Sequence, residues 1–167
     1  MRALDHIDRY LVSPIGPVNA WIATLGASCA TALAYFGGAE LGLALLAKPS
    51  GVAVFWPASG IAAGLLVAAG RRAGVAVVVG VVVGTVAANL ISDRHLVTSL
   101  LKGFCNAGEA VLVAWILDRW FGRPFNFDRI RRVIGFFAAA AVAAATSAIG
   151  GALTMTTFHA SAPFLDV

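Results

Sequence analysis

The chain is divided into long runs of apolar residues, separated by short polar segments. Five such runs carry few or no charged residues, over residues 18–39, 52–70, 73–91, 97–118 and 133–158. About 20 apolar residues in an α-helix, rising about 1.5 Å each, cross the roughly 30 Å hydrocarbon core of a bilayer. The pattern therefore predicts an all-α fold, a polytopic helical membrane bundle of about five transmembrane helices.

Local signals refine the predicted helices. The first can continue to Leu46 if Glu40 is tolerated within it. The second opens at Trp56–Pro57, where a proline in the first turn costs no hydrogen bond. Only residues 71–74 separate the second helix from the third, so we expect these two helices to form a tight antiparallel hairpin.

Composition supports a membrane protein. Hydrophobic residues make up 60% of the 167 and charged residues 12%, and this is too little charge to cover a water-facing surface. A soluble enzyme, a secreted disulfide scaffold and a disordered tail are thereby excluded. Cys29 and Cys105 lie inside apolar runs, where they behave as small hydrophobes. The glycine spacings Gly60–Gly64 and Gly80–Gly84 predict close helix packing.

Basic residues predict the orientation, because Lys and Arg are retained on the cytoplasmic side. With the N-terminus inside, nine arginines fall in cytoplasmic segments, while only Lys48 and Arg94 fall outside and Lys102 lies within a helix. Residues 1–17 are then a cytoplasmic segment, 18–158 the integral-membrane domain and 159–167 a periplasmic end. The net charge of +4 is explained by these clusters, so we expect no nucleic-acid partner.

The helix at 97–118 carries the most informative polar residues. Lys102, Asn106 and Glu109 are spaced by four and three, which places them on one helix face. An ionisable side chain at the bilayer centre costs roughly 2.5–3.5 kcal/mol, so this face should line a wet interior. Further polar or aromatic residues at similar depth could complete a cavity open to the periplasm: Trp56, Ser59, Asn89 and Glu40.

A structural interpretation of the same residues stays open. Lys102 can extend to the outer interface and Glu109 can hydrogen-bond to a neighbouring helix. Glu40 and Asn89 can simply mark helix ends. The basic loop 119–132 can bind anionic lipid headgroups or a cytoplasmic partner.

No pattern for catalysis is found. The sequence lacks a Walker loop, HExxH, GxSxG, a Rossmann glycine motif and kinase motifs, and its three histidines are far apart in the chain. We therefore expect a non-enzymatic chain with no catalytic residue, no cofactor and no metal site.

Several short motifs together resemble one family, the first type of bacterial membrane-associated sensor domain, a MASE-type module. They span roughly residues 50–151 and comprise Trp56-Pro57-Ala58-Ser59-Gly60-Ile61-Ala62, Gly70-Arg71-Arg72, Asn106-x-x-Glu109-Ala110, Leu117-Asp118-Arg119, Arg132-Val133-Ile134-Gly135-Phe136 and Ser147-Ala148-Ile149-Gly150.

The resemblance implies a multi-pass sensory input module of the bacterial inner membrane. Such a module passes a signal to a cytoplasmic output domain, either a histidine kinase of a two-component system or a diguanylate cyclase that makes cyclic di-GMP. The family's domain is usually longer, and five spans leave the C-terminus outside, so we expect a truncated chain, with a stand-alone short member as the alternative. The expected partners are the lipid bilayer, a cytoplasmic output domain or partner protein, and a second copy of the chain. A small transporter that uses Glu109 and Lys102 is the alternative function.

Overall fold

Five helices form the described part of the chain in a computed structural model. The structure describes residues 17–47, 52–53, 56–70, 73–92 and 95–158. The helices are α2 (Pro17–Ala44), α3 (Pro57–Ala69), α4 (Gly74–Ile91), α5 (Leu96–Phe121) and α6 (Ile130–Phe158). Two-residue strands β1 (Leu46–Ala47) and β2 (Val52–Ala53) pair antiparallel between α2 and α3, with Leu46 opposite Ala53. The prediction of a helical membrane bundle is confirmed, and the β-ribbon is a small addition to it.

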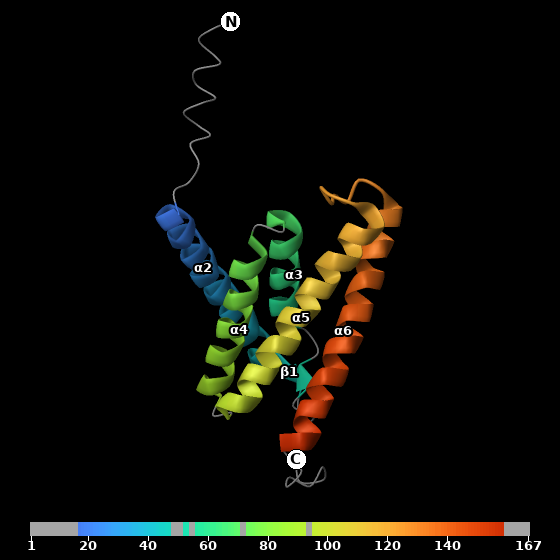
Figure 1. The fold of residues 1–167 in the computed structure, drawn as a ribbon. Coiled ribbons are helices and arrows are strands. Elements are labelled where there is room, and N and C mark those ends of the chain that lie inside the picture. The colour runs from blue at the N-terminus through green and yellow to red at the C-terminus, as the bar shows by residue number, and fades with distance from the viewer. Residues whose placement is uncertain (1–16, 48–51, 54–55, 71–72, 93–94, 159–167) are drawn as a thin grey trace, which may run out of the picture.

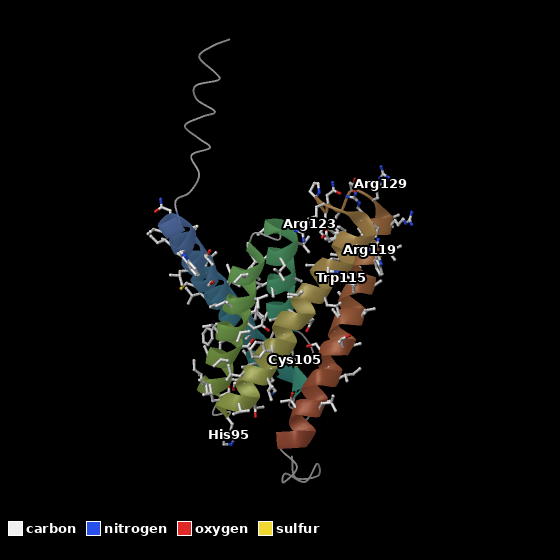
Figure 2. The ribbon with its side chains drawn as sticks, in the orientation of Figure 1. His95, Cys105, Trp115, Arg119, Arg123 and Arg129 are labelled. Atoms are coloured by element: carbon white, nitrogen blue, oxygen red, sulfur yellow. The ribbon has the colours of Figure 1, made fainter. Side chains whose placement is uncertain are left out.

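The helices run up and down through one bundle (Figure 1). The start of α2, the end of α3, the start of α4 and the α5–α6 loop lie at one end, which we call the basic end; the end of α4 and the start of α5 lie at the opposite end. Arg119, Arg123 and Arg129 lie at the basic end, and His95 marks the opposite end (Figure 2).

In the part of the chain that the structure describes, four helices are long and apolar enough to cross a membrane: α2, α4, α5 and α6. Each exposes large hydrophobic side chains that lipid would cover, including Leu33, Val75, Trp115 and Ile134. Helix α3 has only 13 residues, which is about 20 Å at helical rise. It begins at Pro57 rather than near residue 52, because Val52 and Ala53 pair with β1 and the proline ring favours the first helical position.

The closest helix crossing joins α2 to α4. A Cβ at Gly80 would lie 2.6 Å from the Ser28 carbonyl oxygen, and a Cβ at Gly84 would lie 2.8 Å from that of Ala32. The missing side chains thus let the two backbones touch, as predicted for this glycine pair. The prediction is wrong for Gly60 and Gly64, which face open space.

Gly80 and Gly84 also explain why α3 and α4 do not form the expected tight hairpin. Helix α4 packs mainly on α2 and α5, and α3 packs mainly on α2 and α5, whereas the direct contact between α3 and α4 is small. The glycine face of α4 admits α2, and this places α2 rather than α3 against it.

Two clusters of buried residues hold the bundle together. The first joins α2, α3, α4 and α5 around Tyr35, Leu66 and Val81. The second joins α3, α5 and α6 around Leu117, Ala139 and Ala143, all within 1% of full burial. Helix α6 reaches the bundle through this second cluster and packs chiefly along α5.

Aromatic rings close the α5–α6 hairpin at the basic end. Phe121 packs against Phe125 at 5.9 Å between ring centroids, and Phe127 joins Phe125 at 5.2 Å and Phe136 of α6 at 5.4 Å. A side chain at Gly135 would overlap the Phe121 ring. The hairpin is therefore tightly packed where the chain turns.

Two glycines end the helices that reach the basic end. Gly70 after α3 has φ 71° and Gly122 after α5 has φ 70°, a region that side chains disfavour. Each N–H donates back to the helix, Gly70 to the Leu66 carbonyl at 3.1 Å and Gly122 to the Asp118 carbonyl at 3.0 Å. Both helices consequently stop sharply.

Candidate signal-binding cavity

A cavity of about 640 Å³ opens between the helices, and we call it the polar cavity. Side chains from the Trp56 region, α3, α4, α5 and α6 line it, together with one residue of α2. Its lining consists of Leu43, Trp56, Ser59, Ala88, Asn89, Ser92, Lys102, Cys105, Asn106, Glu109, Ala144, Ser147, Ala148 and Gly151. Cys105, one of these residues, lies in the half of the bundle away from the basic end (Figure 2).

Six of the seven residues that the sequence singles out as ligand-binding candidates line this cavity: Trp56, Ser59, Asn89, Lys102, Asn106 and Glu109. All six are half-buried, so the cavity surface is accessible. Glu40 is not part of the lining. Its Oε1 is buried and makes no hydrogen bond to the residues that the structure describes, and the structure does not place this acid with the other candidates.

The α5 face supplies both charges of the cavity. Lys102 and Glu109 are two helical turns apart, about 10.5 Å along the axis, with Cys105 and Asn106 between them. The α5 spacing thus brings an ammonium and a carboxylate onto one wall. The other lining residues have neutral side chains.

Two asparagines converge on Thr85 at the back of the cavity. Asn106 Nδ2 of α5 donates to Thr85 Oγ1 at 3.3 Å, and Asn89 Nδ2 donates to the Thr85 carbonyl oxygen at 2.8 Å. Thr85 itself is 2% exposed. These bonds engage one N–H of each amide and restrict its orientation, and both asparagines line the cavity.

Tyr35 extends the same network to α2. Its ring is fully buried, and Trp56 Nε1 donates to its hydroxyl at 3.5 Å. The side chains of Thr85 and Asn106 are also within hydrogen-bonding reach of this hydroxyl. One polar network therefore ties α2, the start of α3, α4 and α5 together behind the cavity.

The sequence analysis missed Tyr35 and Thr85 in this network. A signal for both exists, since a tyrosine or threonine hydroxyl inside a membrane helix needs a hydrogen-bond partner. A threonine hydroxyl can also donate to a carbonyl one turn earlier in its own helix, as Thr31 and Thr146 do. The sequence around Thr85 therefore does not show whether its hydroxyl bonds within α4 or to another helix.

Small residues of α6 form the wall opposite α5. Ala144, Ser147, Ala148 and Gly151 line it, and a Cβ on the neighbouring Gly150 would lie 3.0 Å from the Cys105 sulfur. Within the described residues the hydroxyls of Ser147 and Ser59 make no side-chain hydrogen bond. The two helices are thus close at Cys105 but leave room beside it, and polar groups there are available to a ligand.

The lining is suited to binding. It offers one base, one acid, two amides and several hydroxyls around an indole ring. Among the residues described, no three His, Cys, Asp or Glu side chains gather closely enough to hold a metal ion.

A smaller space of about 220 Å³ lies near the basic end, among α3, α4 and α5. It is lined mostly by apolar residues, with Asp118 and Arg123 at one side. These two residues form an ion pair, Arg123 Nε to Asp118 Oδ1 at 3.0 Å, which leaves little charge for a ligand.

Comparison with known proteins places the chain in a family. Residues 26–167 match the family model of MASE1, and this range contains the whole lining of the polar cavity. Neither the curated proteins nor the solved structures give a match. MASE1 is an integral-membrane input domain rather than a catalyst, which agrees with the four apolar spans of a multi-pass inner-membrane protein. Because the matched range covers most of the sequence and the motifs quoted above resemble the same module, the chain belongs to the MASE1 family of membrane-associated sensor domains.

Proposed function

We propose that the chain is a sensory input module that binds a small polar signal molecule in the polar cavity and passes the signal to a cytoplasmic output domain. The observation that carries the proposal is the meeting of six polar or aromatic candidates from different segments around one accessible cavity. Packing alone does not call for such a lining, because apolar side chains would fill the same space without the cost of burying Lys102 and Glu109.

In our proposal the cavity faces the periplasm. The arginine imbalance assigns the basic end to the cytoplasm, and the cavity residue Cys105 lies in the other half of the bundle. A cysteine introduced at His95 should then react with an impermeant maleimide in intact cells, and one at Arg129 should not. The reverse pattern would place the cavity on the cytoplasmic side and contradict the proposal.

Transmission is attributed to the α5–α6 hairpin. Near the cavity its helices meet through small side chains, whereas at the basic end the aromatic rings join them firmly. A ligand that touches both α5 and α6 can change their separation, and the rigid turn carries that change to the basic end as movement against the α2–α4 pair. An output domain on the cytoplasmic face would respond to it.

Glu109 is the residue to test first. A diguanylate cyclase reporter is fused ahead of α2, because the start of α2 lies at the same end as the α5–α6 loop (Figure 1). We expect Glu109→Gln to insert normally and to change reporter activity, because it removes the charge while keeping shape and hydrogen bonding. Glu109→Ala reports the additional loss of packing.

Glu40→Gln is the matched control, because Glu40 is an acid outside the cavity lining. Membrane abundance and cyclic di-GMP are measured together for all three variants. Wild-type output from a stably inserted Glu109→Gln protein would contradict the proposed function and leave Glu109 as a packing residue.

A further inference from the structure

We propose that the ligand of the polar cavity is a small zwitterion whose ammonium and carboxylate are separated by the length of a di- or tripeptide. This inference rests on the proposed function, which makes the cavity a binding site. It adds the chemical class of the ligand and the direction in which the ligand lies.

Charge is the first argument. Among the lining residues that the structure describes, Lys102 is the one base and Glu109 the one acid. A simple anion would be attracted by Lys102 and repelled by Glu109. A simple cation would be attracted by Glu109 and repelled by Lys102. In a half-buried site such forces are screened less than in water. A ligand with both charges is attracted at each end.

Distance is the second argument. The α-carbons of Lys102 and Glu109 are about 10.5 Å apart along α5, seven residues at helical rise. An extended peptide spans about 3.4 Å per residue, so the charged ends of two or three residues match this scale. A single amino acid and an aminophospholipid headgroup both hold their charges much closer together. The 640 Å³ cavity also has room for more than one amino-acid residue.

Hydrogen bonding between the two charges is the third argument. Asn106 lies between Lys102 and Glu109 on the same face, and Asn89 lies across from it on α4. Both amides already donate one N–H to Thr85, so their orientation is fixed before a ligand arrives. Side-chain amides offer the same donor and acceptor pair as a peptide bond and can pair with one. Ser147 adds a hydroxyl from the α6 wall.

The order of the charges along α5 gives the ligand a direction. Lys102 is one and a half turns from the start of the helix at the cavity end, and Glu109 is two turns deeper. The ligand's carboxylate would therefore lie nearer the start of α5, and its ammonium nearer the basic end. The small residues Ala144, Ala148 and Gly151 leave space for varied ligand side chains along the α6 wall.

Cys105 allows binding to be read directly, because its thiol lines the cavity. A Cys29→Ala chain, purified in phosphatidylglycerol nanodiscs, keeps Cys105 as its single thiol. The measurement is the rate at which Cys105 reacts with a small methanethiosulfonate. The probes are glycine, diglycine, triglycine, N-acetyl-triglycine and triglycine amide.

We expect diglycine or triglycine to slow labelling at concentrations about tenfold lower than glycine or either blocked peptide, because each blocked peptide lacks one charge-assisted contact. Glu109→Gln should abolish the preference for triglycine over N-acetyl-triglycine. Lys102→Met should abolish the preference for triglycine over its amide. Glu40→Gln should change neither preference.

Equal protection by blocked and unblocked peptides would overturn the inference, as would no protection by any peptide. Protection by phosphatidylethanolamine in the nanodisc, without an effect of peptides, would overturn it in favour of a lipid headgroup. In each of these cases a changed reporter output from Glu109→Gln would still support the sensor function. Wild-type reporter output from Glu109→Gln would contradict the proposed sensor function, whatever the peptides do.

Discussion

The two halves of the α5–α6 hairpin are built from different side chains. In one half, α6 contributes the small residues Ala144, Ala148 and Gly151 to the wall of the polar cavity. Toward the basic end, the same two helices meet through fully buried Ala139 and Ala143, through Leu117, and then through a series of phenylalanine rings. The hairpin therefore borders an open cavity in one half and is closed by packed rings in the other, although both halves belong to one pair of apolar helices.

The comparison shows how one helix pair can separate sensing from transmission. Small residues leave space for a ligand, and they also leave few contacts to resist a change of separation. Large interlocking rings have the opposite property, since close-packed interiors transmit displacement rather than absorb it. The predictions below test this difference, beginning with the largest expected effect.

Adding a large side chain to α6 should have opposite consequences in the two halves. Ala143 is fully buried against α5, so Ala143→Phe should lower the free energy of unfolding by about 3 kcal/mol or more, since overpacking forces neighbours apart. Ala148 faces the polar cavity, so Ala148→Phe should leave stability nearly unchanged while it fills the cavity and alters reporter output. Thermal unfolding in detergent and cyclic di-GMP measure the two effects. Equal stability of both variants would mean that the halves do not differ in packing.

The α2–α4 crossing, like the closed half of the hairpin, should not tolerate added side-chain volume. Gly80→Ala places a methyl group against the Ser28 carbonyl and should destabilise by about 1–3 kcal/mol. Gly64→Ala is its control, because nothing lies within 4 Å of that Cβ and alanine is the better helix former. Thermal unfolding of the pair should show a lower midpoint for Gly80→Ala alone. A loss of stability in both would indicate a general effect of replacing glycine in these helices.

The polar network behind the cavity should contribute less to the free energy of unfolding than these packing contacts do. Thr85→Val removes the hydroxyl that accepts from Asn106 and interacts with Tyr35, at a cost of about 1 kcal/mol for one hydrogen bond. Since the Asn106 amide then loses its fixed orientation, reporter output should change as well. Thr146→Val is the control, because this exposed hydroxyl of α6 only bonds back to its own helix, at Val142. Unchanged stability and reporter output of Thr85→Val would show that the network contributes to neither.

The ion pair at the basic end should have the smallest effect. Asp118 and Arg123 are partly solvent-exposed, so Asp118→Asn should change the free energy of unfolding by no more than about 0.5 kcal/mol. The aromatic rings rather than this pair are expected to hold the turn. A large destabilisation of Asp118→Asn, measured by the same thermal unfolding, would mean that the ion pair rather than the aromatic rings stabilises the turn.

Much of the fold follows from the sequence, because lipid imposes strong rules. Apolar length predicts the four long helices, and the extension of the first through Glu40 occurs, since α2 runs to Ala44. Helical spacing likewise groups Lys102, Asn106 and Glu109 on one face, and the cavity contains all three. Such features depend on local periodicity, which the chain displays directly.

Features that depend on helix partners were not predictable in the same way. Gly80–Gly84 and Gly60–Gly64 have the same spacing, yet only the first pair meets another helix. The length of α3 depends on β1 pairing with β2, and the position of Glu40 depends on how α2 is turned. Tyr35 and Thr85 come together only after α2 packs on α4, so their shared role is a tertiary property.

A cross-link between the two helix walls tests the central claim, that the open half of the hairpin controls output. The Cβ of a residue at position 150 would lie 3.0 Å from the Cys105 sulfur, close to the Cβ-to-sulfur separation across a disulfide. Gly150→Cys in a Cys29→Ala chain should therefore form a disulfide with Cys105 on oxidation. We predict that oxidation of membranes carrying this variant fixes reporter activity at a new level, that reductant restores it, and that the chain without Gly150→Cys does not respond. Complete cross-linking with unchanged reporter activity would contradict the account.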